Sequence, residues 1–473
     1  MQGLVAYGTY VPYWRLDRQR IAEELLTPAG RGTRAVASYD EDTTTMGVEA
    51  ARVALAAAPE GLLPHALYFA TSAPAYADKT NATAIHAALG LDRAGFAADM
   101  AGAVRSAFAA VGAALDGSRP TLVVLSDTRT GLPGGADESG GGDAAAALRF
   151  GEGPVLAEVI GGADASEEFL ERWRLPGDDH SRVWEERFGE TAYVPLAEQV
   201  WTEALKSAGI TPDAVDHLAV CGVHSRAARR FVAGAGVRSE ALRDDLTGVI
   251  GNSGAAHLGI LLAGVLDQAA PGDTVAILQI ADGAVCLLLR VTDAITGYRE
   301  RRETAHTLAA QIASGRTDLA YPTFLTWKGQ LHREPPRRPD PTSPAAPPSL
   351  RHEAWKFGFT GSRCVNCGTR HLPPARVCIS CGAVDQMVPE RLADAAGRIA
   401  TFTVDRLAFS LSPPVVAVVV DFDGGGRIRC EMTDVDPATV AIGDRVEMTF
   451  RKISTANGIH NYFWKARPAQ GES

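Results

Sequence analysis

The sequence predicts an α/β protein with a long, repeating first part and a small region of short strands at its C-terminal end. Three observations lead to this fold class. Apolar strand-like runs alternate with Ala-rich helical segments up to about residue 330, a Pro-rich segment follows at 333–350, and short strand-like runs separated by Gly and Asp come after it. A chain of 473 residues exceeds what one hydrophobic core usually supports, so two or more domains are expected.

The first set of elements opens directly after the N-terminus. Its short apolar runs are typical of buried parallel strands, and its Ala-rich segments are typical of helices. The pattern predicts strands at 4–12, 66–72 and 121–126, and helices at 43–58, 82–89 and 101–115.

A second set repeats this order. It predicts helices at 195–209 and 254–268, a strand at 217–223, and a strand pair at 273–280 and 284–291. Two successive sets of similar order indicate a duplicated α/β fold with mixed, buried sheets, whose halves span 1–165 and 166–332. Between them, the Gly-rich stretch at 131–153 lacks the order of a phosphate-binding P-loop, so it is interpreted as a surface loop.

The Pro-rich segment 333–350 predicts an extended linker, because its composition cannot bury a core. Behind it, in a region spanning 351–385, two C-x-x-C pairs supply four thiolates at the spacing of a zinc ribbon: Cys364, Cys367, Cys378 and Cys381. Four protein ligands leave no open coordination position, which favours a structural zinc ion over a catalytic one. The redox interpretation of C-x-x-C is weaker, because the motif occurs twice and outside a βαβ unit.

The last region, 386–473, contains strand-like runs at 398–405, 414–422, 445–451 and 460–465, which fit a small OB-type β-barrel. Such a barrel after a zinc ribbon raises nucleic-acid binding as a prospect. A net charge of −10 and the lack of a basic stripe interleaved with aromatics argue against it. Phe402, Tyr462 and Phe463 are therefore expected in the barrel core or an interface.

Composition bounds the setting of the protein. Hydrophobic residues make up 46% and charged residues 22%, which is ordinary for a soluble globular chain. The sequence lacks an apolar run of about 18 residues and a secretory signal pattern, so neither a membrane partner nor export is expected. Four of the seven cysteines lie in the metal cluster rather than in a disulfide framework, which predicts a cytoplasmic protein.

Residues 1 to about 330 resemble the hydroxymethylglutaryl-CoA synthase branch of the thiolase superfamily. Five separated motifs carry the resemblance in the expected order: Gly8–Leu16, Asp40–Ala51, Arg187–Gln199, Val223–Phe231 and Ile250–Leu261. The C-terminal part resembles the small acyl-CoA-associated zinc-ribbon and OB-fold domain that partners thiolase-like enzymes. The resemblance implies a duplicated, five-layered thiolase fold, CoA-thioester substrates and a homodimer formed through the thiolase-like domain.

Two of the family's site residues have counterparts here and two do not. His224 matches the substrate-binding His, and Asn252 matches the Asn that binds the thioester carbonyl. Val104 stands where the family has its Cys nucleophile, and Thr71 stands where it has its Glu acid. Cys221 and Cys286 lie in apolar strands and are expected in the core. The resemblance therefore implies a carbonyl clamp without a covalent step.

These matches favour acyl-CoA carbon–carbon chemistry through a thioester enolate, in the aldol, retro-aldol or Claisen sense. The general base remains open among His224 itself, Tyr76, His257 and another Tyr. Two alternatives stay open as well. The chain could be a hydroxymethylglutaryl-CoA synthase proper, or an acyl-CoA-binding scaffold without activity, in which His224 and Asn252 are structural.

Overall fold

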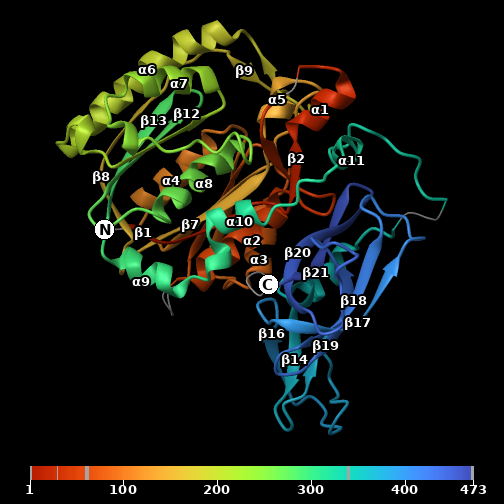
Figure 1. The fold of residues 1–473 in the computed structure, drawn as a ribbon. Coiled ribbons are helices and arrows are strands. Elements are labelled where there is room, and N and C mark those ends of the chain that lie inside the picture. Colours follow the sequence, from red (N-terminus) through yellow and green to blue (C-terminus); the bar gives the residue numbers. More distant parts are fainter. Residues whose placement is uncertain (1–2, 29, 59–62, 338–340, 470–473) are drawn as a thin grey trace. The chain divides into compact units, whose positions relative to one another are not determined.

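The computed structural model describes residues 3–28, 30–58, 63–337 and 341–469 (Figure 1). It divides into two compact units. The first unit comprises Met1–Ala37, Asp42–Thr83 and Asp92–Tyr321, and the second comprises Ser38–Glu41, Ala84–Leu91 and Pro322–Ser473. Each unit is described by itself.

A nine-stranded mixed sheet forms the core of the first unit. Parallel pairs lie at its two ends, and antiparallel pairs join them through the middle. In spatial order the strands are β11 (His217–Gly222), β12 (Thr274–Ile280), β13 (Ala284–Val291), β8 (Ala157–Ala165), β1 (Gly3–Tyr10), β7 (Ala144–Gly151), β6 (Thr121–Asp127), β4 (Ala66–Thr71) and β5 (Phe96–Ala101).

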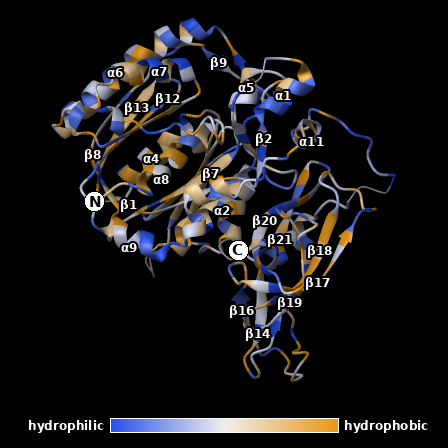
Figure 2. Cartoon of the chain, viewed as in Figure 1, coloured by the Kyte–Doolittle hydropathy of each residue, from blue (hydrophilic) through white to orange (hydrophobic). Residues whose placement is uncertain are grey.

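Two helices, α2 (Thr43–Ala56) and α8 (His257–Leu266), are buried on almost all sides and pack against the middle of the sheet. The apolar colouring of α8 in Figure 2 agrees with this burial. In contrast, α6 (Glu186–Ala208) buries one face on β8 and β13 and exposes polar residues on the other, which is the pattern of an outer helix.

The remaining elements of the first unit are shorter. Two small strand pairs are β2 (Trp14–Asp17) with β3 (Thr33–Val36) and β9 (Arg172–Trp173) with β10 (Arg182–Val183). The helices are α1 (Arg18–Leu25), α4 (Ser106–Asp116), α5 (Ala136–Gly140), α7 (Ser225–Gly234), α9 (Ala294–Arg301) and α10 (Leu308–Ala313), with 3₁₀ turns at Pro212–Ala214, Ser239–Ala241, Gly254–Ala256 and Thr304–His306. Most of α3 (Ala82–Ala88) and of α11 (Tyr321–Trp327) belongs to the second unit.

Two predictions for this unit were wrong. The Gly-rich stretch 131–153 is not a surface loop throughout, because its Ala run forms β7, a fully buried central strand. Alanine has little intrinsic preference for strands, and here burial on both faces decides. The helix predicted to begin at Ala101 begins at Ser106 instead, since Ala101 ends β5 and Gly102 turns the chain with a φ of 123°.

The second unit contains the ribbon and the barrel. The ribbon strands are β14 (Thr360–Cys364), β15 (Arg370–His371) and β16 (Met387–Arg391). The closed barrel runs in the order β17 (Gly397–Asp405), β18 (Val415–Phe422), β19 (Arg427–Met432), β21 (Ile459–Pro468) and β20 (Arg445–Ala456). The predicted barrel is confirmed, and β19 is the strand that the sequence pattern missed.

The predicted linker is only partly extended. Ala346–Arg351 forms α12, which begins with Pro in its first turn, and Glu353–Lys356 forms α13. Proline is favourable in a first turn because its missing N–H would have no helical partner there. Residues 338–340 of the linker lie outside the described residues.

Aromatic side chains form the interior of the second unit. Tyr462 stacks on Phe450 with ring centroids 5.5 Å apart, and Phe463 contacts Trp355 at 5.2 Å. Tyr462 is buried, while Phe402 and Phe463 are half-buried. Their expected place in the barrel core or an interface is confirmed for Tyr462 and Phe463.

A group of charged side chains, buried except for Glu431, also lies in the second unit. Arg451 pairs with Glu41 and Asp434, and Lys465 lies 2.9 Å from Asp40 and 2.7 Å from Glu431. Burial opposes ionisation of Asp40, but Lys465 and Arg451 outweigh it and lower the pKa of this carboxyl to about 2. We call these six residues the ionic cluster.

Candidate active site

A cavity of about 600 Å³ opens in the first unit, where β11 ends and α7 begins. His224 and Asn252, the two matched site residues, both line it. A smaller cavity of about 90 Å³, which Val104 lines, shares Arg129, Arg172 and Val223 with the large one. The structure therefore brings the predicted clamp residues to one cavity and places the nucleophile position beside it.

The end of β11 determines where His224 lies. Gly222 has a φ of +155°, and a Cβ there would collide with the carbonyl oxygen of Ile280. Only glycine fits this approach, and the chain then turns so that His224 caps α7. The Ala227 N–H donates to Nδ1 of His224 at 3.0 Å, and Nε2 of the same ring donates to the Glu186 carbonyl at 3.0 Å. His224 is thus the neutral tautomer with its hydrogen on Nε2.

Asn252 is held on the other side by the backbone. Its Nδ2 donates to the Gly222 carbonyl at 2.6 Å, and its Oδ1 accepts from the Gly254 N–H at 2.9 Å. Because an amide nitrogen carries two hydrogens, one N–H of Asn252 is left for a ligand in the cavity. The available donors of the clamp are therefore this N–H and the Nε2–H of His224, if a stronger acceptor displaces the Glu186 carbonyl.

Val104 and Thr71, which the sequence motifs match to the family's nucleophile and acid, offer neither a thiol nor a carboxyl group. Val104 lies two residues before α4 and is buried. Thr71 ends β4, where its hydroxyl accepts from the Ala73 N–H at 3.0 Å and lies 3.4 Å from Asp127. A hydroxyl in this setting cannot carry protons near neutral pH.

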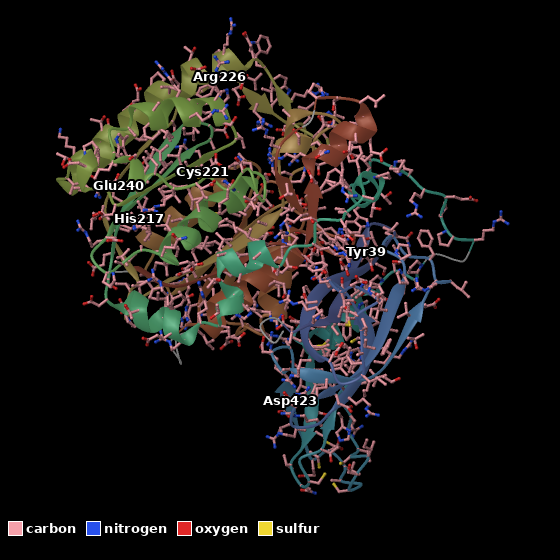
Figure 3. All side chains as sticks on the ribbon, viewed as in Figure 1. Tyr39, His217, Cys221, Arg226, Glu240 and Asp423 are labelled. Carbon is pink, nitrogen blue, oxygen red and sulfur yellow. The ribbon has the colours of Figure 1, made fainter. Side chains whose placement is uncertain are left out.

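The remaining thiols do not compensate for Val104. Cys221 and Cys286 are buried in the hydrophobic core, and Figure 3 labels Cys221 in the first unit. Burial raises the pKa of both thiols to about 12. Since the thiolate is the nucleophilic form, neither can attack a thioester at neutral pH.

Two weaker candidates do not line either of these cavities. His257 is buried in α8, with Nδ1 3.1 Å from the Ser253 hydroxyl and Nε2 2.9 Å from the Asp245 carbonyl. The backbone N–H of Tyr76 donates to Asn81 at 3.0 Å. Neither is among the residues that surround His224 and Asn252 in the described part of the chain.

The walls of the large cavity carry more positive than negative charge. Arg18, Arg129, Arg172 and Arg229 line it, and of these Arg172 pairs with Asp137 at 2.6 Å. The Gly-rich stretch that the sequence analysis assigned to the surface also contributes to the wall, from Gly131 to Gly141. A cavity with this lining attracts anionic ligands.

The four cysteines of the ribbon meet in the second unit. Their Sγ atoms all lie within 4.8 Å of one another, with Cys364 to Cys381 at 3.6 Å and Cys367 to Cys378 at 3.5 Å. Tetrahedral zinc with bonds of about 2.3 Å to sulfur requires this kind of spacing. The donor set and its geometry fit a structural zinc ion.

Comparison with known proteins identifies the first part of the chain. It is 30% identical over 350 residues to the hydroxymethylglutaryl-CoA synthase of Aeropyrum pernix, covering 70% of this chain and 94% of that protein. Identity to the corresponding enzyme of Methanothermobacter thermautotrophicus is 30% over 355 residues, covering 70% and 99%. The chain belongs to the hydroxymethylglutaryl-CoA synthase family.

Solved structures agree on the fold of this family member. A structure titled MvaS in complex with 3-hydroxy-3-methylglutaryl coenzyme A matches with a TM-score of 0.58 at 21% identity, covering 72% of this chain and 94% of that chain. PksG, an HMG-CoA synthase from Bacillus subtilis, matches with a TM-score of 0.58 at 19% identity, covering 69% and 88%. The thiolase-like α/β fold is thereby confirmed.

The C-terminal part matches two family models. Residues 358–385 match the ChsH2 rubredoxin-like zinc ribbon domain, and residues 390–451 match the ChsH2 C-terminal OB-fold domain. The predicted zinc ribbon and OB-fold are confirmed. Within the described residues, no helix has the length and apolar character needed to cross a membrane.

The sequence motifs did not indicate one residue that lines the large cavity. Glu171 lines the large cavity, is only 2% exposed, and precedes β9. In the sequence it follows Glu167 and Glu168 closely, and such a run of acidic residues is typical of an exposed segment. No local pattern distinguishes it, because its burial depends on α6 and on the start of α7, which are distant in sequence.

Proposed function

We propose that this protein acts on CoA thioesters by stabilising an enolate, and that it makes or breaks a carbon–carbon bond without forming an acyl-enzyme. The observation that carries the proposal is the cavity that His224 and Asn252 both line, whose described lining residues include no cysteine. Membership in a family of CoA-thioester enzymes supports the substrate class. The arginine-rich lining suits the phosphates of coenzyme A.

The clamp would act on the thioester oxygen. In retro-aldol cleavage of a β-hydroxyacyl-CoA, the Cα–Cβ bond breaks and its electron pair becomes the enolate, whose oxygen gains negative charge. The free N–H of Asn252 can donate to that oxygen, and an oxyanion competes for the Nε2–H of His224 better than the neutral Glu186 carbonyl does. Removal of one such donor costs an enzyme about 3 to 4 kcal/mol.

A panel of β-hydroxyacyl-CoA thioesters tests the proposal. The purified full-length protein is incubated with 3-hydroxybutyryl-CoA and longer or branched homologues, and the acyl-CoA and carbonyl products are followed by mass spectrometry. Asn252→Ala should lower turnover about 100-fold or more, whereas Gln199→Ala, on the exposed side of α6, should leave it unchanged. A protein that neither cleaves nor condenses any member of the panel would contradict the proposal.

Family membership favours a second candidate, hydroxymethylglutaryl-CoA synthase activity proper. This activity needs a covalent acetyl-enzyme, which Val104 cannot form. The intact mass of the protein after incubation with acetyl-CoA decides between the two. An added acetyl group would support the synthase, and an unchanged mass agrees with the non-covalent proposal.

The hydrogen bonds that already occupy His224 and Asn252 favour a third candidate, a non-catalytic acyl-CoA-binding scaffold. Calorimetry separates it from an enzyme. A scaffold binds a CoA ester with His224→Ala altering neither binding nor flux, while the enzyme loses turnover in this variant.

We also propose a homodimer formed through the first unit, on the resemblance to thiolase-like proteins. Light scattering of the full-length protein would give about twice the chain mass of 49.9 kDa. A monomer at micromolar concentration would contradict this part of the proposal.

A further inference from the structure

The wall of the large cavity contains a buried carboxylate without a protein partner for one of its oxygens. Oε2 of Glu171 is buried in this wall and makes no hydrogen bond to the described part of the chain. Its backbone is fixed, because the Trp184 N–H donates to the Glu171 carbonyl at 2.8 Å and closes the β9–β10 hairpin. A buried polar atom without a partner is costly, so its presence calls for an explanation in terms of a ligand.

Glu171 lies beside the clamp. A Cβ added to Gly189 of α6 would come 2.5 Å from Nε2 of His224 and 2.8 Å from Cγ of Glu171. The imidazole and the carboxylate side chain therefore meet at the same point on the helix surface, and both line the cavity. Glycine at position 189 is what allows the two side chains to approach α6 this closely.

The other acidic side chains that line the two cavities are differently placed. Asp137 pairs with Arg172 at 2.6 Å. The Glu186 side chain is 62% exposed to solvent, and Asp282 of the smaller cavity is exposed as well. Among the acidic residues of these walls in the described ranges, Glu171 combines deep burial with an unpartnered oxygen.

We propose that Glu171 is the general base of this cavity and replaces the proton carrier that the family position at Thr71 no longer supplies. The inference rests on the proposed function, and it assigns to a single residue the base that the sequence left open among His224, Tyr76 and His257. His224 is poorly suited to that task because the Ala227 N–H already occupies its basic nitrogen.

The proton balance is closed within the cavity. The Glu171 carboxylate takes the β-hydroxyl proton as the Cα–Cβ bond of a β-hydroxyacyl-CoA breaks, and an aldehyde or ketone leaves. The electron pair of that bond enters the enolate, and the protonated Glu171 returns the same proton to Cα, which yields the shorter acyl-CoA. In the opposite direction, Glu171 removes an α-proton and delivers it to the new alkoxide.

The surroundings of Glu171 set the pH at which it can work. Burial raises the pKa of this carboxyl above its usual range, which makes its carboxylate a stronger base than an exposed glutamate. The charged and titratable groups that face it come from its own strand, from α5, from the start of α7, from α6 and from the turn after β12: Arg172, Asp137, His224, Tyr193 and Asp282. Arg172 opposes the increase, and Asp282 and Asp137 add to it.

Exchange of α-hydrogens provides the test. The full-length protein is incubated with propionyl-CoA in D₂O, and deuterium incorporation is followed by mass spectrometry, in parallel with cleavage of the β-hydroxyacyl-CoA panel. Glu171→Gln keeps the side-chain size and should slow both reactions about 100-fold or more, with KM changed little. Glu171→Asp should keep part of the activity, and Glu168→Gln, an exposed neighbour, should match the wild type.

The outcomes separate the two proposals. A wild type that exchanges α-hydrogens while Glu171→Gln exchanges at the same rate overturns the role of Glu171 and leaves the proposed function intact. A wild type without exchange or cleavage overturns both. In the active enzyme, kcat should fall as the pH drops below the pKa of Glu171, and this acidic limb should disappear in Glu171→Gln.

A stability measurement checks the buried carboxylate without any substrate. Because the folded pKa is raised, the native state holds a proton that the unfolded chain releases, so stability falls as the pH rises above the ordinary pKa of a glutamate. Glu171→Gln removes this loss, and its Tm should exceed that of the wild type by a margin that grows with pH. A Tm below that of the wild type at pH 8 would mean that the charge is paired, and would contradict the proposal.

Discussion

Both units bury charge, but they arrange it differently. In the ionic cluster of the second unit, Arg451 and Lys465 lie against carboxylates from several segments. In the cavity of the first unit, the buried carboxylate of Glu171 keeps one oxygen without a partner. In the ionic cluster, opposite charges stabilise one another. In the cavity, Glu171 keeps an oxygen that is still able to accept a proton.

The pKa values of Asp40 and Glu171 are shifted in opposite directions. Asp40, buried between cations, has its pKa lowered to about 2, and Glu171, buried with an unpartnered oxygen, has its pKa raised. A lowered value marks a carboxylate that stabilises the fold, and a raised value marks one whose ionisation costs stability. Burial also raises the pKa of Asp434, a member of the ionic cluster, to about 7, so the contrast in pKa is one between Asp40 and Glu171 and not between the two arrangements as a whole.

Removal of the ribbon metal should have the largest effect, because it turns four paired thiolates into unpaired ones. Zinc binding to small ribbons contributes on the order of 10 kcal/mol of folding free energy. Chelation of the full-length protein, or Cys378→Ser, should therefore unfold the ribbon, as seen in circular dichroism, with loss of one zinc per chain by elemental analysis. Cys430→Ala, in the barrel and outside the cluster, should keep the metal.

Disruption of the ionic cluster should come next. Arg451→Met leaves Glu41 and Asp434 buried without their cation and should lower the free energy of unfolding of the second unit by about 3 to 5 kcal/mol. The exposed pair Arg427–Asp421 provides the control, since Arg427→Met should cost less than about 1 kcal/mol. Equal losses in the two variants, measured by denaturant titration, would contradict the contrast between paired and exposed charges.

The change in stability with pH that Asp40 causes should be smaller than the loss in Arg451→Met. Its sign should be opposite to that of the change that Glu171 causes. With its pKa lowered to about 2, Asp40 stabilises the fold above its ordinary pKa, and this stabilisation is lost as the pH falls from about 5 towards 2. The loss is on the order of 2 kcal/mol. Thermal unfolding between pH 7 and pH 3 should show a shallower decline in Asp40→Asn than in the wild type.

Gly189→Ala should have the smallest effect on stability. The added methyl group would push on His224 and Glu171, and the cost of overpacking is partly offset by better helix propensity, which leaves a net loss of about 1 kcal/mol. Turnover should nevertheless fall about tenfold, since both groups are displaced. Gly234→Ala, which meets only open space at the end of α7, should leave turnover unchanged.

The sequence predicted what periodicity and spacing encode. The spacing of the two C-x-x-C pairs alone was enough to predict the zinc ligands Cys364, Cys367, Cys378 and Cys381. The apolar runs were enough to predict most strands. Strand β7 was missed because its Ala residues favour strands only when both faces are buried, which depends on β1 and β6. Glu171 was missed for a similar reason, since an acidic residue near others gives no local sign of burial.

The hydrogen bonds of the clamp residues could not be predicted from the sequence either. The motifs predicted that His224 and Asn252 belong to one site. They did not predict the hydrogen bonds to the carbonyls of Glu186 and Gly222, which occupy donors of these two side chains. These partners come from α6 and from the end of β11, and only the folded backbone brings them together.

Four residues near the N-terminus, Ser38–Glu41, belong to the second unit although the chain on both sides of them belongs to the first. Their carboxylates complete a cluster whose cations lie more than 400 positions later in the polypeptide. Cutting the gene at the Pro-rich segment would separate the carboxylates of Asp40 and Glu41 from the cations Arg451 and Lys465. We therefore expect the two pieces to be recovered in good yield only when they are co-expressed, since neither would be a self-sufficient folding module.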